Sequence, residues 1–338
     1  MSKRLVQLHN GTNRLVAVVE EPGLRLVGGF TSLYAIVRAA IDSRERLRDV
    51  VREHLSDETL EYDPIWQGKS DWKLLSPIDH PDEPARCLVS GTGLTHLGSA
   101  KDRTAMHQMP DEKMTDSMRM FRSGLDGGKP AAGQIGTPPE WFYKGNGTIL
   151  RAPNDPLDVP PYALDGGEEA EIVGVYMIGP DSRAYRIGMA QGNEFSDHKY
   201  EKINYLNLAA SKLRNCSIGP ELVIDPDFQS ISGTVAIERG GAVMWSKQIQ
   251  SGEKEMSHSL ANLEHHHFKH DAHRRPGDVH VHYFGAHSLS FGEGVSLMDG
   301  DVMSVCFEGF GRALRNPLRM KEAKEQLISA VPMGEGAG

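Results

Sequence analysis

One short stretch constrains the fold of this chain more than any other: residues 166–179, which read GGEEAEIVGVYMIG. After Glu171 the stretch is almost continuously apolar, as is typical of a β-strand that is covered on both faces. Side chains two residues apart point to the same side of a strand, so Glu169 and Glu171 lie side by side, about 6 to 7 Å apart along the chain. Pairs of glutamates on strands commonly face solvent. The apolar run that follows favours instead a pair that points into a pocket, with a cation between the two carboxylates.

Length and composition restrict the class of protein. The chain has 338 residues, of which 39% are hydrophobic, so it can bury a sizeable core and has room for one large domain and a smaller one. It contains no long apolar run and does not start with an apolar signal core, so we expect a soluble, cytoplasmic protein that does not bind membranes. The net charge of -9 and the lack of a basic stripe argue against nucleic acid as a partner. The scattered cysteines Cys87, Cys216 and Cys306 indicate neither a disulfide framework nor a cysteine metal site.

The pattern divides the chain into two predicted domains. Residues 1–71 read as a small α+β domain with its linker: short strands up to residue 28, then one amphipathic helix over 32–55. The segment 61–84 is rich in Pro and Asp and reads as the linker itself. Residues 72–330 form the main domain and are mostly β-prone, so the fold class is mixed but mainly β.

The main domain is expected to alternate strands with a few helices. Residues 104–135, rich in Met, Gly and charge, read as a loop or lid. Helices are expected at 200–214 and 256–270. Strands are expected at 86–90, 171–178, 183–191, 220–224, 233–239, 242–249, 279–284 and 301–308.

A third acidic residue follows the next predicted strand. Glu194 lies in the turn Gly-Asn-Glu-Phe-Ser-Asp-His at 192–198, which also reads as a helix N-cap. Together with Glu169 and Glu171 it would supply three oxygen ligands, the set that suits Mg²⁺ or Mn²⁺. Without a cation, three clustered carboxylates would raise one another's pKa values and could not all stay ionised. The sequence therefore predicts a divalent-cation site.

These motifs resemble those of the fumarylacetoacetate hydrolase superfamily. EEAEIVGVY is similar to its E-x-E metal strand, GNEFSDH to the turn with the third ligand, and SKLRNCSIGPELV to its G-K segment that ends at a Pro. LLSPIDHPDEPARCLVSGTG is similar to the entry loop of the family. EWFYKGNGTI is similar to its aromatic-lysine substrate loop, and LMDGDVMSVCFEGFGRALRNPL to its C-terminal stretch. The resemblance spans roughly residues 72–318, with all six motifs in the family's order.

The resemblance implies a rolled, barrel-like β-sandwich as the catalytic domain, one divalent cation and a homodimer or higher homo-oligomer. It also implies a small-molecule substrate that carries a 2-oxo acid or a β-dicarbonyl. Glu169, Glu171 and Glu194 fall on the metal positions of the family. Lys212 falls on the lysine beside the substrate carbonyl, and Lys144 on the substrate-loop lysine.

Three departures from the family pattern narrow the expected reaction. The third metal ligand is usually Asp, and here it is Glu194. The water-activating His-x-x-Glu pair of the hydrolases is reduced to His96-Leu-Gly-Ser99, without the Glu. Residues 283–291 replace the family's T-G-T-P segment. These departures resemble the branch that dehydrates 2-keto-3-deoxy sugar acids, the pentonates in particular, to 2-oxoglutarate semialdehyde (2,5-dioxopentanoate).

The expected dehydration needs no attacking water. A metal that chelates the carboxylate and the 2-keto oxygen acidifies the C3 hydrogens, because the enolate charge develops on an oxygen bound to the cation. Lys212 and His96 are the candidate base and acid, in either order, although His96 also fits a purely structural histidine at a turn. The candidates for the hydroxyls and carboxylate of the substrate are Ser99, Arg103, His287 and Ser288.

Two other functions fit parts of the pattern. One is an acylpyruvate-type C–C hydrolase or an oxaloacetate-type decarboxylase on the same metal site, with Asp102 or Glu112 as the missing carboxylate. The other is a sugar-acid sensor or scaffold, which would not need the charged metal site.

The histidine-rich residues 264–270, with His273, His280 and His282, are expected to form a solvated helix face and interface packing rather than a zinc site.

Overall fold

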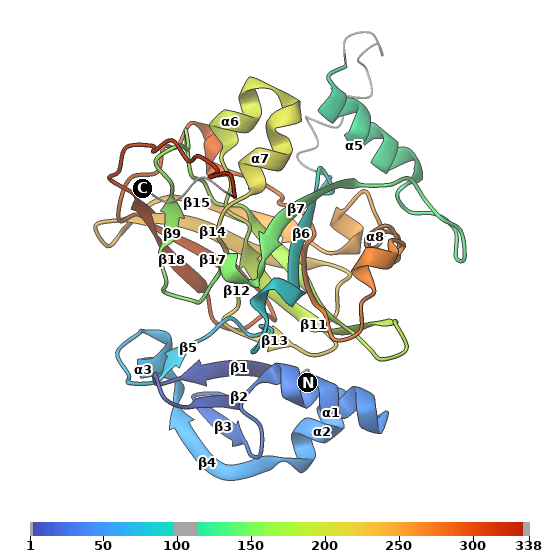
Figure 1. Cartoon of the computed structure of the whole chain (residues 1–338), viewed down its shortest axis with the longest axis vertical. Helices are drawn as coiled ribbons and strands as arrows, with labels where there is room; N and C mark the ends of the chain where they lie inside the picture. Colours follow the sequence, from blue (N-terminus) through green and yellow to red (C-terminus); the bar gives the residue numbers. More distant parts are fainter. Residues whose placement is uncertain (1–2, 98–113, 334–338) are drawn as a thin grey trace.

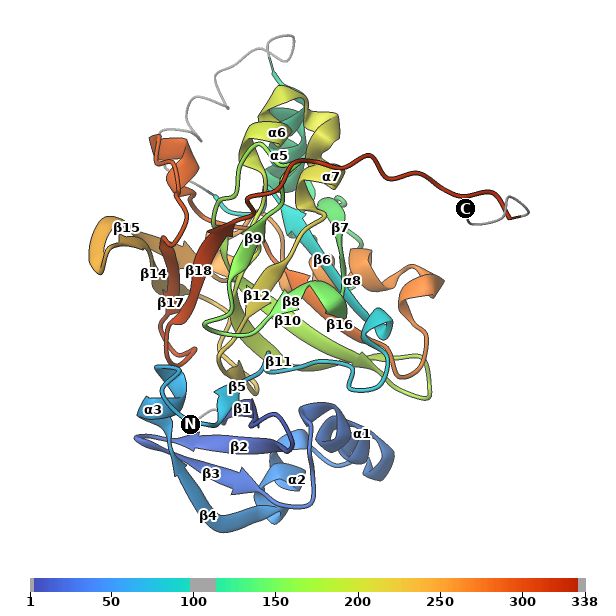
Figure 2. The same ribbon diagram turned by 60° about the vertical axis from the view of Figure 1, so that its left-hand side comes forward.

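Two β-sheets form the framework of the molecule, as seen in Figures 1 and 2. The computed structural model describes residues 3–97 and 114–333. The larger sheet has 13 strands, ten of them in the order β4-β3-β2-β1-β13-β11-β10-β16-β6-β7. The smaller sheet has 5 strands in the order β15-β14-β17-β18-β9. This architecture confirms the expected fold class, a mixed but mainly β structure. No helix within the described ranges is long and apolar enough to cross a membrane.

The N-terminal part adds an antiparallel layer to the larger sheet. Its strands and helices are β1 (Arg4–His9), β2 (Arg14–Glu20), β3 (Gly23–Val27), α1 (Leu33–Ser43), α2 (Leu47–Glu53), β4 (Leu55–Glu61), α3 (Tyr62–Trp66) and β5 (Lys73–Leu74). The single helix expected over 32–55 is two helices, because Arg44 adopts a left-handed conformation at φ 60° and ends α1. Strand β1 pairs with β13, so this layer continues the main sheet. The division of the chain near residue 72 stays a prediction.

The hairpin of β10 and β11 occupies the centre of the larger sheet. The hairpin consists of β10 (Ala170–Ile178) and β11 (Ala184–Asn193). The other strands of the main domain in this sheet are β6 (Cys87–Gly93), β7 (Glu140–Asn146), β8 (Leu150–Arg151), β12 (Cys216–Ile218), β13 (Leu222–Val223) and β16 (Val279–Tyr283). Every residue of β10 is buried, which confirms the strand covered on both faces. The antiparallel partners of β10 are β11 on one side and β16 on the other.

The smaller sheet packs on the larger one and shares a core with it. Its strands are β9 (Leu157–Val159), β14 (Ile231–Arg239), β15 (Ala242–Ser251), β17 (Val302–Phe307) and β18 (Leu314–Met320). One hydrophobic cluster joins Ile172 and Tyr176 of β10 to Val305 and Phe307 of β17. Burial of such large side chains stabilises the fold by about 1.5 to 3 kcal/mol each. The hairpin that carries the acidic residues is thus held from both sides.

Short helices fill the long connections. They are α5 (Asp116–Gly127), α6 (His198–Ile203), α7 (Leu208–Lys212) and α8 (Leu260–Phe268), with 3₁₀ turns at Pro84–Arg86, Gly147–Ile149, Tyr205–Asn207, Glu253–Glu255, Asp271–His273 and Ser290–Glu293. The helix expected over 200–214 is split, because Asn204 is extended and its side chain accepts from the backbone N–H of Leu206. Helix α5 lies within the expected loop over 104–135, whose first part lies outside the described residues.

The eight strands expected in the main domain are confirmed, whereas β7, β8, β9, β12 and β18 were not expected from the sequence. Strand β18 contains Pro317, which lacks a backbone N–H and weakens the strand pattern. Strand β7 alternates buried and exposed residues over 140–144, but the charged Glu140 and Lys144 lie on its buried side, so its sequence does not resemble that of an ordinary core strand. Both strands are stabilised by neighbours that are distant in sequence.

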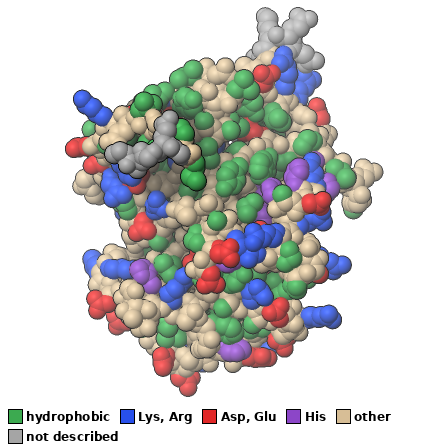
Figure 3. Space-filling model, viewed as in Figure 1, with side chains coloured by type: hydrophobic (Ala, Val, Ile, Leu, Met, Phe, Trp, Pro, Cys, Tyr) green, Lys and Arg blue, Asp and Glu red, His purple; other side chains and the backbone are tan. Residues whose placement is uncertain are grey.

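The expectation of a solvated histidine face was wrong. His267 on α8 and His280 and His282 on β16 are 1%, 0% and 1% exposed. The indole N–H of Trp141 donates to His267 Nδ1 at 3.2 Å, so His267 carries its proton on Nε2, which lies 2.9 Å from His280 Nδ1. Figure 3 shows histidine side chains among hydrophobic ones on the side of the molecule that carries α8. Packing of α8 against β16, which no local pattern encodes, removes these rings from solvent.

These buried histidines predict a loss of stability in acid. Burial, followed by the charge of His273, lowers the pKa of His282 to about 3. The unfolded chain takes up this proton below about pH 6.5 and the folded chain does not, so the stability is fully present above pH 6.5 and falls as the pH drops. We expect His282 to contribute about 2 kcal/mol to the difference in unfolding free energy between pH 7 and pH 5.

Urea unfolding of His282→Asn at the two pH values measures this difference. Asn keeps a polar atom near Ser90, whose hydroxyl lies 2.8 Å from His282 Nδ1. The variant should show a correspondingly smaller difference, while His270→Asn, at an exposed position beside the same cluster, should behave like the unaltered protein. Equal pH dependence in the two variants would contradict the assignment.

Candidate metal centre and active site

The three predicted carboxylates meet at the open end of the β10–β11 hairpin. Residues 170 and 193 are partners in the hairpin, and the backbone N–H of Glu194 donates to the carbonyl of Glu169 at 3.0 Å. This register places Glu169, Glu171 and Glu194 together, with oxygens that all lie within 4.8 Å of one another. All three side chains are buried. Among the described residues, this is the one group of His, Cys, Asp or Glu side chains arranged to hold a metal ion.

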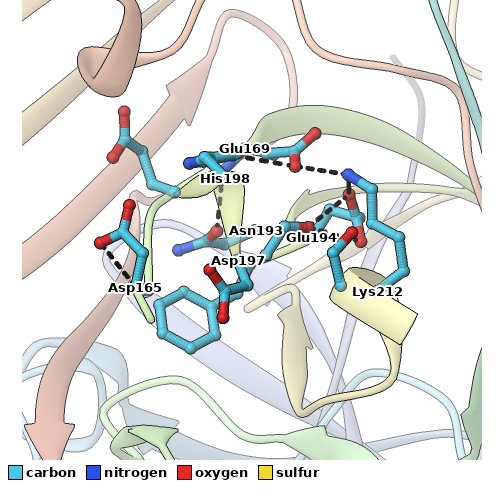
Figure 4. A network of polar contacts seen from close by, with 12 residues as sticks. Asp165, Glu169, Asn193, Glu194, Asp197, His198 and Lys212 are labelled. Carbon is cyan, nitrogen blue, oxygen red and sulfur yellow. Dashed lines mark hydrogen bonds and ion pairs between the residues drawn. The ribbon is translucent and has the colours of Figure 1, made fainter. Parts of the chain in front are cut away.

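Two lysines surround the triad, as Figure 4 shows for Lys212. Lys212 Nζ, at the end of α7, lies 2.5 Å from Glu169 Oε1 and 2.6 Å from Glu194 Oε2. Lys144 Nζ, on β7, lies 2.6 Å from Glu194 Oε1 and also donates to the carbonyls of Phe195 and Lys212. Lys144 is 0% exposed, so it contacts Glu194 from within the protein interior. Its expected contact with substrate stays a prediction.

The charges of this cluster favour a cation. Burial raises the pKa of Glu171 well above its ordinary value, and the charges of Glu194 and Glu169 raise it further. Burial also raises the pKa of Glu169, but Lys212 and His198 outweigh it, so this pKa lies well below its ordinary value. One carboxylate of the triad is therefore left without an adequate partner. A divalent cation would supply the missing positive charge, and three hard oxygen ligands fit Mg²⁺ or Mn²⁺.

Outer contacts orient each of the three carboxylates. His198 Nε2 lies 3.1 Å from Glu169 Oε1, and the hydroxyl of Ser196 donates to Glu194 at 3.1 Å. The backbone N–H of Gly285 donates to Glu171 Oε2 at 2.7 Å. Such contacts fix the directions of metal ligands and commonly set metal affinity. Both oxygens of Glu194 accept such contacts, from Ser196 and from the two lysines.

A cavity of about 850 Å³ opens beside the triad. Glu169 and Lys212 line its inner end, and of the other residues expected from the sequence it brings in His96, His287 and Ser288. The cavity thus combines candidate residues from four segments that are far apart in the chain. Ser99 and Arg103, expected to contact substrate, lie outside the described residues, as do Asp102 and Glu112.

His96 faces the cavity with both ring nitrogens already in contact with hydroxyl groups. Its Nε2 lies 3.1 Å from Ser251 Oγ and its Nδ1 3.2 Å from Thr95 Oγ1. Burial, with a smaller effect of His287, lowers the pKa of His96 to about 3. The ring is therefore neutral and held in place. A direct role for His96 in proton transfer stays a prediction.

Glu140 is a candidate that the sequence analysis missed. It is the first residue of β7, is buried, and faces the cavity. The hydroxyl of Tyr205 donates to its Oε2 at 2.6 Å, and burial raises its pKa more than this bond lowers it. A Cβ at residue 93 would lie 1.9 Å from Glu140 Oε1, so any side chain in place of Gly93 would displace the Glu140 carboxylate. The alternation of side chains along the strand could have identified Glu140 from the sequence. Residues 140, 142 and 144 face the same side, and Lys144 was already a candidate site residue.

Comparison with solved structures identifies the fold. A crystal form of 2-keto-3-deoxyarabinonate dehydratase matches with a TM-score of 0.71 and 15% identity, over 95% of this chain and 100% of that one. The chain therefore has the same overall fold as this dehydratase. The 2-keto-3-deoxy-D-arabinonate dehydratase complexed with magnesium and 2,5-dioxopentanoate matches with a TM-score of 0.69 and 15% identity, with the same coverage. No protein-family model and no curated protein sequence matches the chain.

Isomerases share this fold with the dehydratases. The 5-carboxymethyl-2-hydroxymuconate delta-isomerase from Mycobacterium smegmatis matches with a TM-score of 0.58 and 17% identity, over 94% of this chain and 100% of that one. At these identities the matches establish the fold, and the reaction must be argued from the side chains of the site.

The triad predicts a specific loss of metal binding in Glu171→Gln. The amide is neutral and a weaker ligand, so we expect Mn²⁺ affinity to fall at least about 100-fold, since loss of an outer-shell contact alone typically reduces affinity about 10- to 100-fold. Isothermal titration with Mn²⁺, or electron paramagnetic resonance of free Mn²⁺, measures this change. Glu221→Gln, at a buried carboxylate outside the cavity, is the matched control and should keep the affinity. Equal affinities in the two variants would contradict the assignment.

Proposed function

We propose that the protein is a divalent-cation-dependent dehydratase of 2-keto-3-deoxy sugar acids. The proposed substrate is a 2-keto-3-deoxypentonate and the product is 2-oxoglutarate semialdehyde. The observation that carries the proposal is the joint placement on one cavity of Glu140, Lys212 and Glu169, the last of which belongs to the buried triad. A divalent cation held by the triad would bind the 2-oxo acid group and acidify the hydrogens on C3. The dehydratase fold, and the magnesium and 2,5-dioxopentanoate bound to one such enzyme, support the same reaction.

Lys212 suits the role of a fixed positive charge. Its ammonium lies between two carboxylates of the triad, at 2.5 and 2.6 Å, and faces the cavity. Burial lowers the pKa of Lys212, but Glu169 and Glu194 raise it more, so the group stays charged. A charged lysine is a poor base, but it stabilises negative charge that develops on the 2-oxo oxygen of the substrate.

Glu140 suits the transfer of the proton. Its carboxylate is buried, and its raised pKa makes it a stronger base than an exposed carboxylate. Glu140 takes a proton from C3, and the protonated carboxyl then gives this proton to the C4 hydroxyl, which leaves as water. The C3–H and C4–O bonds break, a C3–C4 double bond forms, and tautomerisation gives the semialdehyde. The hydrogen bond from Tyr205 keeps the carboxyl in position throughout.

The geometry around His96 argues against C–C hydrolysis. A hydrolytic histidine needs a carboxylate on one ring nitrogen, to orient the ring for activation of water. Both nitrogens of His96 contact hydroxyl groups instead. In the described part of the cavity no histidine–carboxylate pair other than His198 with the metal-ligating Glu169 is formed. An elimination has no need of such a pair. A homodimer in the cytoplasm stays a prediction based on the resemblance.

The reaction is tested by assay of the purified protein on the D and L isomers of 2-keto-3-deoxypentonate with Mg²⁺. Formation of the semialdehyde is followed with a coupled aldehyde dehydrogenase, and we expect turnover that EDTA abolishes. Glu140→Gln should lower kcat by about 100- to 10,000-fold with little change in KM, because it removes the group that moves the proton. Lys212→Met should lower kcat similarly.

A matched control separates the chemical effect of Glu140 from general damage. Glu264 also accepts a hydrogen bond from a tyrosine hydroxyl, that of Tyr176 at 3.0 Å, but lies outside the cavity. Glu264→Gln should keep kcat within about a few-fold. If neither isomer yields semialdehyde while Mn²⁺ still binds, the proposal fails. Activity on an acylpyruvate or on oxaloacetate under the same conditions would then identify the hydrolase or decarboxylase.

A further inference from the structure

The segment from Gly285 to Glu293 forms one wall of the cavity. It follows β16, ends in the 3₁₀ turn at Ser290–Glu293, and lines the cavity with most of its residues. His287 and Ser288 carry the imidazole and hydroxyl groups of this wall, which are suited to bind the hydroxyl groups of a sugar acid. We call residues 285–293 the wall loop. Its position decides what part of the substrate these groups meet.

Glu168 holds the far end of the wall loop. Its carboxylate is 0% exposed, and it accepts two hydrogen bonds from one residue: Ser290 N donates to Oε1 at 2.7 Å, and Ser290 Oγ donates to Oε2 at 2.8 Å. Burial of a carboxylate is unfavourable unless such bonds compensate it. The side chain takes no part in the metal triad or in the proposed proton transfer. Neither role explains why a buried carboxylate directly precedes the candidate metal ligand Glu169 in the chain.

The metal ligands hold the rest of the same loop. The backbone N–H of Gly285 donates to Glu171 Oε2 at 2.7 Å, which fixes the near end. The ring of Phe291 lies 5.2 Å from that of His198, which in turn contacts Glu169. The four residues between Gly285 and Ser290 are thus held at both ends by carboxylates of one short stretch, residues 168–171. A shift of this stretch moves the wall of the cavity with it.

We propose that Glu168 is a positioning residue that fixes the wall loop against the metal-binding strand and so sets the affinity for the hydroxyl-bearing end of the substrate. The inference rests on the proposed function for the identity of the substrate, and on the geometry alone for the position of the loop. Loss of the Glu168 contacts releases one end of the loop, whereas the metal ligands and Glu140 keep their places. The effect therefore falls on KM and on the order of the loop, and spares metal affinity and kcat.

The variants Glu168→Ala, Glu168→Gln and Ser290→Ala test this role. In Glu168→Ala we expect KM to rise about tenfold or more, the scale of one strong hydrogen bond, with kcat changed less than about threefold and the Kd for Mn²⁺ unchanged. Glu168→Gln should recover most of the affinity, because its amide can still accept from Ser290 N and donate to Ser290 Oγ. Ser290→Ala removes only the hydroxyl bond and should lie between the two.

Hydrogen exchange of the Mn²⁺-loaded protein tests the position of the loop without substrate. The backbone amides of residues 286–292 should exchange about tenfold faster in Glu168→Ala than in the unaltered protein. Glu221→Ala is the matched control, because Glu221 is also fully buried and accepts from a backbone N–H, that of Arg312, and a hydroxyl, that of Tyr62. It should lower stability without faster exchange in the wall loop.

The outcomes separate this inference from the proposed function. Unchanged KM and unchanged exchange in Glu168→Ala would overturn the positioning role. A fall in Mn²⁺ affinity as large as the change in kcat/KM would also overturn it, because Glu168 would then act through the metal. If the protein does not dehydrate keto-deoxy acids, the exchange and Mn²⁺ measurements still decide whether Glu168 holds the loop.

Discussion

The repulsion among three buried carboxylates is the constraint on which the rest of the site depends. The register of the β10–β11 hairpin brings Glu169, Glu171 and Glu194 together where water cannot screen them. Like charges in such surroundings are unfavourable by several kcal/mol unless cations lie close. Among the described residues, Lys144 and Lys212 lie against these carboxylates and His198 contacts Glu169. A divalent cation would add positive charge beside Glu171 and offset the repulsion that the fold enforces.

The fold maintains this arrangement through the packing of the hairpin. Strand β10 is buried along its whole length between β11 and β16, and the smaller sheet covers it. Local rearrangement of the ligands would therefore require the core to open, which costs far more than the repulsion does. The elements at the open end, α6, α7 and the wall loop, are short and contribute polar groups rather than core. The polar groups on these short elements can therefore differ without a change in the positions of the three carboxylates.

The sequence predicted those parts of the site that local patterns encode. The apolar run after Glu171 and the turn at Glu194 are visible without any contact map, so the two strands and the triad were predicted from them, whereas the pairing of β10 with β11 was not. Glu140 was not predicted, because its role depends on the pairing of β7 with β6 and on Tyr205, which is 65 residues away. The burial of His267 was misjudged for the same reason: the ring lies on a helix whose polar sequence favours solvent, and only the contact with β16 removes it. Such pairings are decided by the whole chain.

One short stretch shows how the strand period divides different tasks among similar residues. Glu168, Glu169 and Glu171 have the same side chain, yet their positions direct them to different partners. Glu169 and Glu171 point to one side of the extended chain and meet Glu194, whereas Glu168 points away from them and meets Ser290. Alternation of side chains along a strand thus places two carboxylates on the metal and one on the wall of the cavity. The candidate metal site and the wall of the cavity are thus held by neighbouring residues of one stretch. The groups that would recognise the sugar hydroxyls are therefore positioned by the same stretch of chain that would hold the cation.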